Sequence, residues 1–110
     1  MNYTALYVCD TTSSAGDNEI IAASGTGQRI CIMSFSIQNE SATPTTMILK
    51  DGSTDRFRFL GQNQGDSMTW GWGLEQEWRL AENSALNLNL SGANQCGYNV
   101  AYFIENVYKS

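Results

Sequence analysis

The fold class is decided by the segment Leu86-Asn87-Leu88-Asn89-Leu90. Its leucines and asparagines alternate strictly, and successive side chains of a β-strand point to opposite faces. As a strand, the segment places all three leucines on one face and both asparagines on the other. In a helix, successive leucines would lie about 200° apart around the axis and would not share one face. The segment therefore predicts a strand with one buried and one polar face.

The same alternation continues through residues 98–107. One face of this run collects apolar side chains, namely Tyr98, Val100, Tyr102 and Ile104. The opposite face is mixed, because Phe103 stands there among polar neighbours. A strand with apolar residues on both faces lies inside a sandwich or is covered by another subunit. Phe103 is therefore a candidate interface residue.

A third long strand is expected over residues 30–37. Strict alternation there would place Met33, Phe35 and Ile37 on one face, opposite Ile32 and two serines. Shorter strands are expected over residues 5–9, 19–23, 45–50, 56–60, 68–72 and 77–80.

Turns rich in Gly, Asn, Asp and Ser separate nearly all of these segments. Short strands at roughly ten-residue spacing predict an all-β fold, a single β-sandwich or jelly-roll-like domain of about eight antiparallel strands. We expect this domain to span residues 1–110, with residues 1–26 forming N-terminal strands and loops that contact a partner.

Length and composition agree with one self-standing domain. The chain has 110 residues and a mass of 12.1 kDa, and 42% of its residues are hydrophobic. Surface scaling predicts about 6,000 Å² of accessible surface when folded and roughly 17,500 Å² when unfolded. A core of this size needs neither disulfides nor a metal ion.

The charge balance argues against nucleic acid as a partner. The net charge is −5, and among the six basic residues only Arg56 and Arg58 stand close together. Nucleic-acid affinity comes largely from clustered Lys and Arg. No apolar run approaches the ~20 residues of a membrane span, and the N-terminus lacks the layout of a signal peptide. We expect no nucleic-acid and no membrane partner.

Three cysteines, Cys9, Cys31 and Cys96, are an odd number without a C-x-x-C spacing, and the chain has no histidine. This is neither a disulfide framework nor a zinc pattern. Each cysteine lies in an apolar, strand-like run, so we expect three buried thiols and synthesis in a reducing cytoplasm. No cofactor or metal site is predicted.

Without histidine the commonest general base is missing, and we expect no enzymatic activity. A paired-carboxylate glycosidase would have to use Glu75, Glu77 or Glu82. We interpret these residues instead as solvated loop acids beside Arg79. The two glycines at Gly25 and Gly27 predict a tight turn and not a phosphate cradle, since the lysine of that motif is absent.

Trp70, Trp72 and Trp78 are the most unusual local feature. Residues 70 and 72 share one face of a strand, so their rings are expected side by side. Three interpretations are open. The rings fill the core, they form a contact between subunits, or they offer a flat platform on which sugar rings stack. The neighbouring Gly71 weakens the first interpretation, because glycine has no side chain to pack.

From residue 27 onward the chain resembles a compact β-sandwich domain common among tailed-bacteriophage virion proteins. That group includes capsid decoration (cement) proteins and tail or fibre modules. The resemblance spans about three-quarters of the chain and is carried by residues 27–37, 47–54, 81–93, 97 and 100–103. Residues 85–93 are its most specific piece.

The resemblance implies a non-enzymatic structural protein on the outer capsid surface of a virion, made in the host cytoplasm. Its expected partner is the phage major capsid protein or another virion protein, which it would bind and stabilise as a homotrimer. We expect decoration, because the sequence carries no shaft or docking segment beside the domain.

The candidate contact regions are residues 1–10, with Tyr3 and Leu6, and the loops at 11–18, 24–28 and 61–66. Two other functions stay open. The first is a tail or head-fibre component of the virion. The second is a carbohydrate-binding module that uses Trp70 and Trp72.

Overall fold

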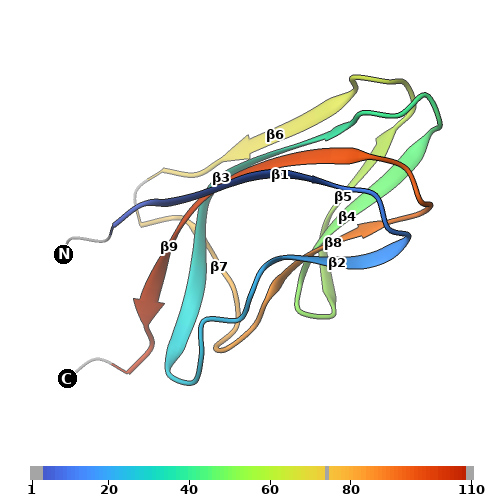
Figure 1. The fold of residues 1–110 in the computed structure, drawn as a ribbon. Helices are drawn as coiled ribbons and strands as arrows, with labels where there is room; N and C mark the ends of the chain where they lie inside the picture. The colour runs from blue at the N-terminus through green and yellow to red at the C-terminus, as the bar shows by residue number, and fades with distance from the viewer. Residues whose placement is uncertain (1–3, 74, 109–110) are drawn as a thin grey trace.

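The computed structural model describes residues 4–73 and 75–108. Within them the chain forms nine strands joined by turns and loops, and no helix (Figure 1). In chain order they are β1 Leu6–Thr12, β2 Gly16–Ile21, β3 Gln28–Asn39, β4 Thr45–Asp51, β5 Thr54–Gly61, β6 Ser67–Gly71, β7 Trp78–Arg79, β8 Leu86–Leu90 and β9 Cys96–Asn106. The all-β prediction is confirmed, with nine strands in place of about eight. None of the described residues belongs to a helix that would be long and apolar enough to cross a membrane.

The strands form two antiparallel sheets. Sheet A has the order β1-β9-β3-β6, with the short β7 pairing to β3, and sheet B has the order β2-β8-β4-β5. The two sheets face each other as a sandwich (Figure 1). Residues 4–26 supply β1 and β2, which are edge strands of the two sheets.

The leucines of β8 lie at the centre of the core. Leu86, Leu88 and Leu90 are 0%, 0% and 1% exposed, and they belong to the same core cluster as Phe35 and Val100 of sheet A. Full burial of a leucine contributes about 2 kcal/mol through the hydrophobic effect. The total accessible surface is 6004 Å², in agreement with the scaling expectation.

A bulge in β3 changes the expected faces of that strand. Its register against β9 shifts between Ile32 and Ser34, so Met33 is an extra residue. As a result, Ile32 and Phe35 both belong to the core cluster, although strict alternation would separate them. The prediction that Ile32 lies opposite Phe35 is wrong for this reason.

An ionic network ties β3, β9 and β7 together beyond the bulge. The Glu105 side chain is 4% exposed, and its Oε1 lies 2.6 Å from Arg29 Nε and 3.5 Å from Arg79 Nε. Arg79 also pairs with Glu77 at 3.1 Å. Glu77 does lie beside Arg79 as expected, but its side chain is only 7% exposed and is not a solvated loop acid.

The cysteines divide into two groups. Cys31 and Cys96 are buried, and burial raises the pKa of each thiol to about 11. Cys9 is exposed, contrary to the prediction of three buried thiols. The reason is position: β1 is an edge strand, and Cys9 is on its outer face.

The expected glycine turn is present before β3. Gly25 and Gly27 have φ values of +110° and +82°, which favour glycine. The Gln28 N–H donates to the Gly25 carbonyl at 3.1 Å, and the Gly27 N–H donates to Glu82 Oε2 at 2.7 Å. A tight turn explains both glycines.

Candidate interaction surface

The sandwich has two open sides. One shows β1 of sheet A and β2 of sheet B, and the other shows β6 with the short β7 of sheet A and β5 of sheet B. On the β1/β2 side, the Thr12 hydroxyl donates to Asn18 Oδ1 at 2.6 Å and joins the two strands. On the β5/β6 side, the rings of Phe57 and Trp70 lie 5.4 Å apart and join β5 to β6. Edge strands present backbone groups that can pair with another chain.

An aromatic cluster fills the β5/β6 side. The Phe57 ring is at its centre, with centroid distances of 5.2 Å to Phe35, 5.4 Å to Trp70, 5.7 Å to Trp72 and 5.0 Å to Trp78. All four pairs are tilted or edge-to-face, the arrangements that aromatic quadrupoles favour. The cluster closes the gap between the two sheets.

The three tryptophans differ in exposure. Trp72 and Trp78 are half-buried and pack against the core cluster. Trp70 is 47% exposed, because β6 is an edge strand and no further strand covers it. The rings of Trp70 and Trp72 lie 6.1 Å apart with a 40° tilt, so they are neighbours but do not form one flat platform. Trp70 is the ring that a partner would reach.

The other candidate residues lie apart from this cluster. Leu6, on β1, is 39% exposed and belongs to the opposite side of the sandwich. Phe103 pairs with Cys31 and is only 6% exposed, so its ring is not offered to a partner. Tyr3 lies outside the described residues.

Tyr7 on β1 is 77% exposed and lies inside the predicted contact region 1–10. Two further exposed apolar residues, Leu60 on β5 at 55% and Tyr108 at 73%, were not predicted. The signal for Leu60 was present, since it directly follows Phe59 in a strand, and one of two consecutive apolar residues must face outward. Among the described residues the exposed large apolar side chains are Leu6, Tyr7, Leu60, Trp70 and Tyr108, and the first four lie on the two open sides.

Basic charge without an internal partner gathers on β5. Of the five Lys and Arg in the described part of the chain, Arg29, Lys50 and Arg79 form internal ion pairs. The remaining two, Arg56 and Arg58, form no ion pair with described residues, and both are exposed.

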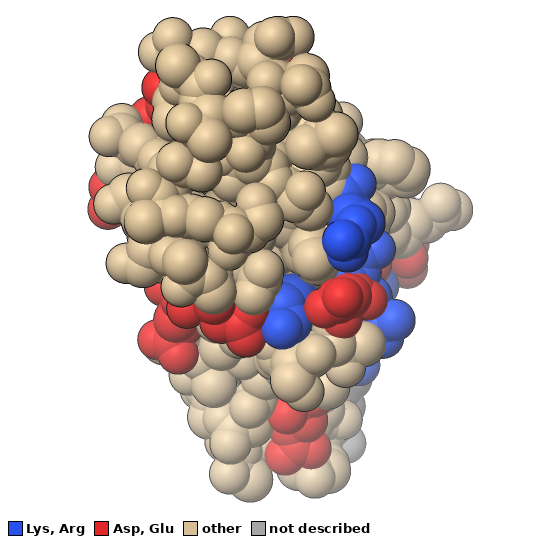
Figure 2. Space-filling view, turned by 90° about the vertical axis from the view of Figure 1, so that its right-hand side faces the viewer, with Lys and Arg blue, Asp and Glu red and all other residues tan. Residues whose placement is uncertain are grey.

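The β1/β2 side is acidic. It carries Asp10, Asp17 and Glu19 and no basic residue. Asp17 lies 3.1 Å from Lys50, and hydrogen bonds from Asn89 and Lys50 lower the pKa of its carboxyl. In Figure 2 the basic side chains lie near the centre and on the right flank with acidic side chains between them, and further acidic side chains lie on the left flank and low on the molecule.

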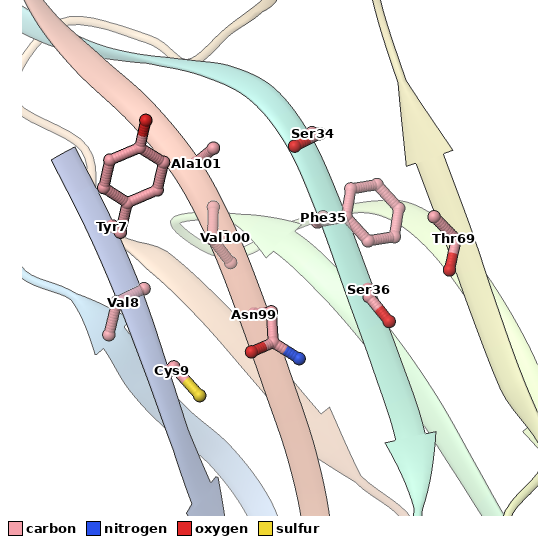
Figure 3. Close-up of a pocket in the computed structure, with 10 residues that line it drawn as sticks. All are labelled: Tyr7, Val8, Cys9, Ser34, Phe35, Ser36, Thr69, Asn99, Val100 and Ala101. Atoms are coloured by element: carbon pink, nitrogen blue, oxygen red, sulfur yellow. The ribbon is translucent and has the colours of Figure 1, made fainter. Parts of the chain in front are cut away.

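A hollow of about 320 Å³ lies on the outer face of sheet A (Figure 3). Short, uncharged side chains from four strands form its floor, among them Ser34, Ser36, Asn99 and Thr69, and Tyr7 stands at its rim. None of the three tryptophans lines it. The hollow therefore offers a small polar floor but no charge to hold an ionic ligand.

The candidate carboxylates take part in contacts that hold turns. Glu77 accepts a hydrogen bond from the Glu75 N–H at 2.5 Å, and Glu82 accepts from the Tyr108 hydroxyl at 3.0 Å, which raises the pKa of Tyr108. Within residues 4–73 and 75–108, no group of three or more His, Cys, Asp or Glu side chains could hold a metal ion.

The protein is thus a two-sheet antiparallel sandwich whose β5/β6 side is filled by an aromatic cluster. No family description matches the sequence, and no curated protein matches it. Among solved structures it is similar to the Bacillus endospore appendages described as a novel family of disulfide-linked pili. That similarity has a TM-score of 0.55, 15% identity, and coverage of 98% of this chain and 93% of the other.

The coat protein of Tobacco streak virus also matches, with a TM-score of 0.34 and 12% identity over 94% of this chain and 90% of the coat protein. Both neighbours are structural proteins, one from a pilus and one from a viral coat. The likeness of fold rests on the first of the two, and it speaks for the sandwich alone.

Proposed function

We propose that this protein is a non-enzymatic structural component of a virion, a capsid decoration protein that binds and stabilises the capsid lattice as an oligomer. The observation that carries the proposal is the distribution of exposed apolar side chains. Four large ones, Leu6, Tyr7, Leu60 and Trp70, lie along the open edges of the sandwich. Exposed apolar residues grouped along strand edges favour contact with another protein surface.

The fold supports the same proposal. Its neighbour in fold comes from the Bacillus endospore appendages, which are described as disulfide-linked pili. A sandwich that leaves its edge strands free is suited to such assemblies, because each edge offers a row of backbone donors and acceptors. The virion setting itself comes from the resemblance of residues 27–37 and 81–93 to phage β-sandwich domains.

The mechanism is physical. A trimer would make three modest contacts with neighbouring capsid subunits, and the second and third would form at high effective concentration. Such a clamp across subunit joints opposes outward pressure from packaged DNA. The net charge of −5 suits the outer surface of the shell, away from the nucleic acid.

The test is co-sedimentation of the purified protein with DNA-free capsids of the phage that carries its gene. We expect saturable binding and a higher melting temperature of the capsids. Trp70→Ala should weaken the binding, whereas Ala93→Ser, an exposed position in the turn between the inner strands β8 and β9, should leave it unchanged. Absence of binding to capsids would contradict decoration, and binding to isolated tails instead would assign the protein to a tail or fibre.

A glycan array probes the remaining alternative. Binding of a glycan that is lost in Trp70→Ala, together with no binding to capsids, would replace the proposed function by carbohydrate recognition. The 40° tilt between Trp70 and Trp72 argues against a flat platform made of both rings, so such binding would use the exposed Trp70 ring alone.

A further inference from the structure

We infer that copies of this chain associate head to tail, with the β5/β6 side of one copy against the β1/β2 side of the next, so that both sheets continue from copy to copy. The inference deepens the proposed oligomer and rests on it. It names the two surfaces that meet, and it is carried by strand direction, register, charge and exposed apolar area.

Strand direction permits this contact in both sheets at once. Each sheet holds an even number of main strands, four, and every neighbouring pair is antiparallel. The two edges of each sheet therefore run in opposite directions. A second copy placed alongside in the same orientation brings its β2 antiparallel to β5 and its β1 antiparallel to β6.

The register of sheet B brings opposite charges to the same level. Asp17 pairs with Asn89, Asn89 with Ile48, and Ile48 with Arg58. Arg58 and Asp17 thus end the same row on the outer face of sheet B, at opposite edges. In the head-to-tail contact Arg58 meets Asp17 of the next copy.

The next row repeats the complementarity. Glu19 pairs with Asn87, and Asn87 pairs with Lys50. Leu49 pairs with Phe57 but Lys50 pairs with Asp55, so Arg56 is the extra residue of a bulge in β5 and lies next to this row. Arg56 of one copy therefore meets Glu19 of the next. Neither Arg56 nor Glu19 forms an ion pair with another described residue of its own chain. The contact would supply the missing partner to each.

Sheet A adds apolar contact on the inner side. Val8 pairs with Val100, Val100 with Phe35, and Phe35 with Trp70, so Val8 and Trp70 end one row. The half-exposed Trp70 ring of one copy would then lie against Val8 and the neighbouring Leu6 of the next. Aromatic anchors of this kind dominate the energy of protein interfaces.

Contacts between unlike sides close into a ring or continue into a filament, depending on the rotation between copies. With both sheets continued and every copy in the same orientation, the copies form an open row. Closing a ring of three would turn each copy by about 120° and could keep only one of the two sheets continuous. A contact between two like sides would give only a two-fold dimer, and it would set Arg56 and Arg58 of one copy against the same arginines of the other.

Cross-linking tests the arrangement with one substitution. The row Cys9, Asn99, Ser36 and Thr69 crosses the outer face of sheet A from edge to edge (Figure 3). Within one chain, three strand spacings separate its ends by about 14 Å, too far for a disulfide. In the Thr69→Cys variant a disulfide between positions 9 and 69 therefore forms only between copies. We expect mild oxidation with diamide to give covalent species larger than a dimer on a non-reducing gel.

The control is the double variant Cys9→Ser/Thr69→Cys, which should show no such species. Cross-linked dimers that persist in this control would show that β6 meets β6, and they would overturn the inference. Monomer alone in the Thr69→Cys variant would overturn it as well. Cys31 and Cys96 are buried and do not enter the reaction.

Charge reversal gives a second, independent readout. Glu19→Lys and Arg56→Glu/Arg58→Glu each remove one side of the contact, and each should weaken self-association at least about tenfold. An equimolar mixture should associate more strongly than either variant alone, because each contact between unlike copies is either native or has both charges of the Arg56/Glu19 pair reversed. Full association of Glu19→Lys alone would overturn the inference. All the changed side chains are exposed, and circular dichroism verifies that both variants fold.

The two proposals fail separately. Capsid binding by a protein that is monomeric at every concentration would keep decoration and reject the head-to-tail contact. Head-to-tail cross-links in a protein that ignores capsids would reject decoration and keep the contact.

Discussion

Strands β8 and β6 share an alternating pattern but have opposite surroundings. Both alternate large apolar residues with small or polar ones, and both are five residues long. The leucines of β8 are at most 1% exposed, because β8 lies between β2 and β4. Trp70 of β6 is 47% exposed, because β6 has a neighbour on only one side.

The difference shows that position in the sheet decides what an alternating strand does. A central strand contributes to the stability of its own chain, whereas an edge strand has apolar surface and backbone groups left over for another chain. The following substitutions separate these two roles.

Leu88→Ala should have the largest effect. Removing a fully buried leucine leaves a cavity, and we expect the free energy of unfolding to fall by about 3 kcal/mol. Urea denaturation measures the loss. The matched change Leu60→Ala, on an edge strand at 55% exposure, should cost below about 1 kcal/mol. Equal losses in the two variants would refute the contrast between centre and edge.

Gly61→Ala probes the point where edge strand β5 enters the core. A Cβ at Gly61 would lie 2.7 Å from Asn39 Cβ, and Asn39 is fully buried with its amide donating to the Gly61 carbonyl at 2.9 Å. We expect a loss of about 2 kcal/mol from overpacking. Gly73→Ala, where an added Cβ meets no described atom within 4 Å, is the control and should be neutral in the same denaturation experiment.

Trp70→Ala should affect stability less than association. The ring is half-exposed and loses its contacts with Phe57 and Trp72, worth about 1 kcal/mol in unfolding. The native mass by light scattering should shift toward the monomer, with the dissociation constant raised at least about tenfold. Trp72→Ala removes a half-buried ring and should lower the free energy of unfolding more than it weakens association. An unchanged mass for Trp70→Ala would refute the role of β6 as a contact edge.

Asp17→Asn should have the smallest effect, and the effect should depend on pH. Hydrogen bonds from Asn89 and Lys50 lower the pKa of Asp17 below 3.8 in the folded chain. The stabilisation is therefore present above pH 3.8 and is lost as pH falls through the lowered value. Because the carboxyl is partly exposed, we expect below about 0.5 kcal/mol at pH 7.

Thermal unfolding at pH 7 and pH 2 measures the effect of Asp17→Asn. Both the variant and its parent carry Arg56→Glu/Arg58→Glu, so that self-association does not contribute to the melting temperature. The melting temperatures of Asp17→Asn and its parent should differ slightly at pH 7, and the difference should shrink as the pH falls. A difference that persists in acid would assign the effect to the amide itself.

The local pattern predicted the strands because a strand with one buried face alternates apolar and polar residues within its own segment. Residues 86–90 and 98–107 alternate clearly, and the structure places strands there and in the seven other expected ranges. The bulge at Met33 was missed because Ile32 and Met33 are both apolar, so nothing local marks the extra residue. The order of strands depends on pairing between distant segments, which no local pattern encodes.

The candidate surface was predicted in part for the same reason. Unusual composition identified Trp70, but only the sheet order reveals that its strand is an edge. Cys9 was expected to be buried, although its strand lies at the opposite edge. The complementary charges of Arg58 and Asp17 become visible only when the register links them across four strands.

The pairing order has a consequence for the timing of folding. In sheet A, β9 lies between β1 and β3, and in sheet B, β8 lies between β2 and β4. The first strands to leave the ribosome therefore wait for partners that are synthesised some 65 to 95 residues later. Neither sheet can close during most of translation, and the early strands depend on the nascent chain remaining unaggregated until the last two strands arrive.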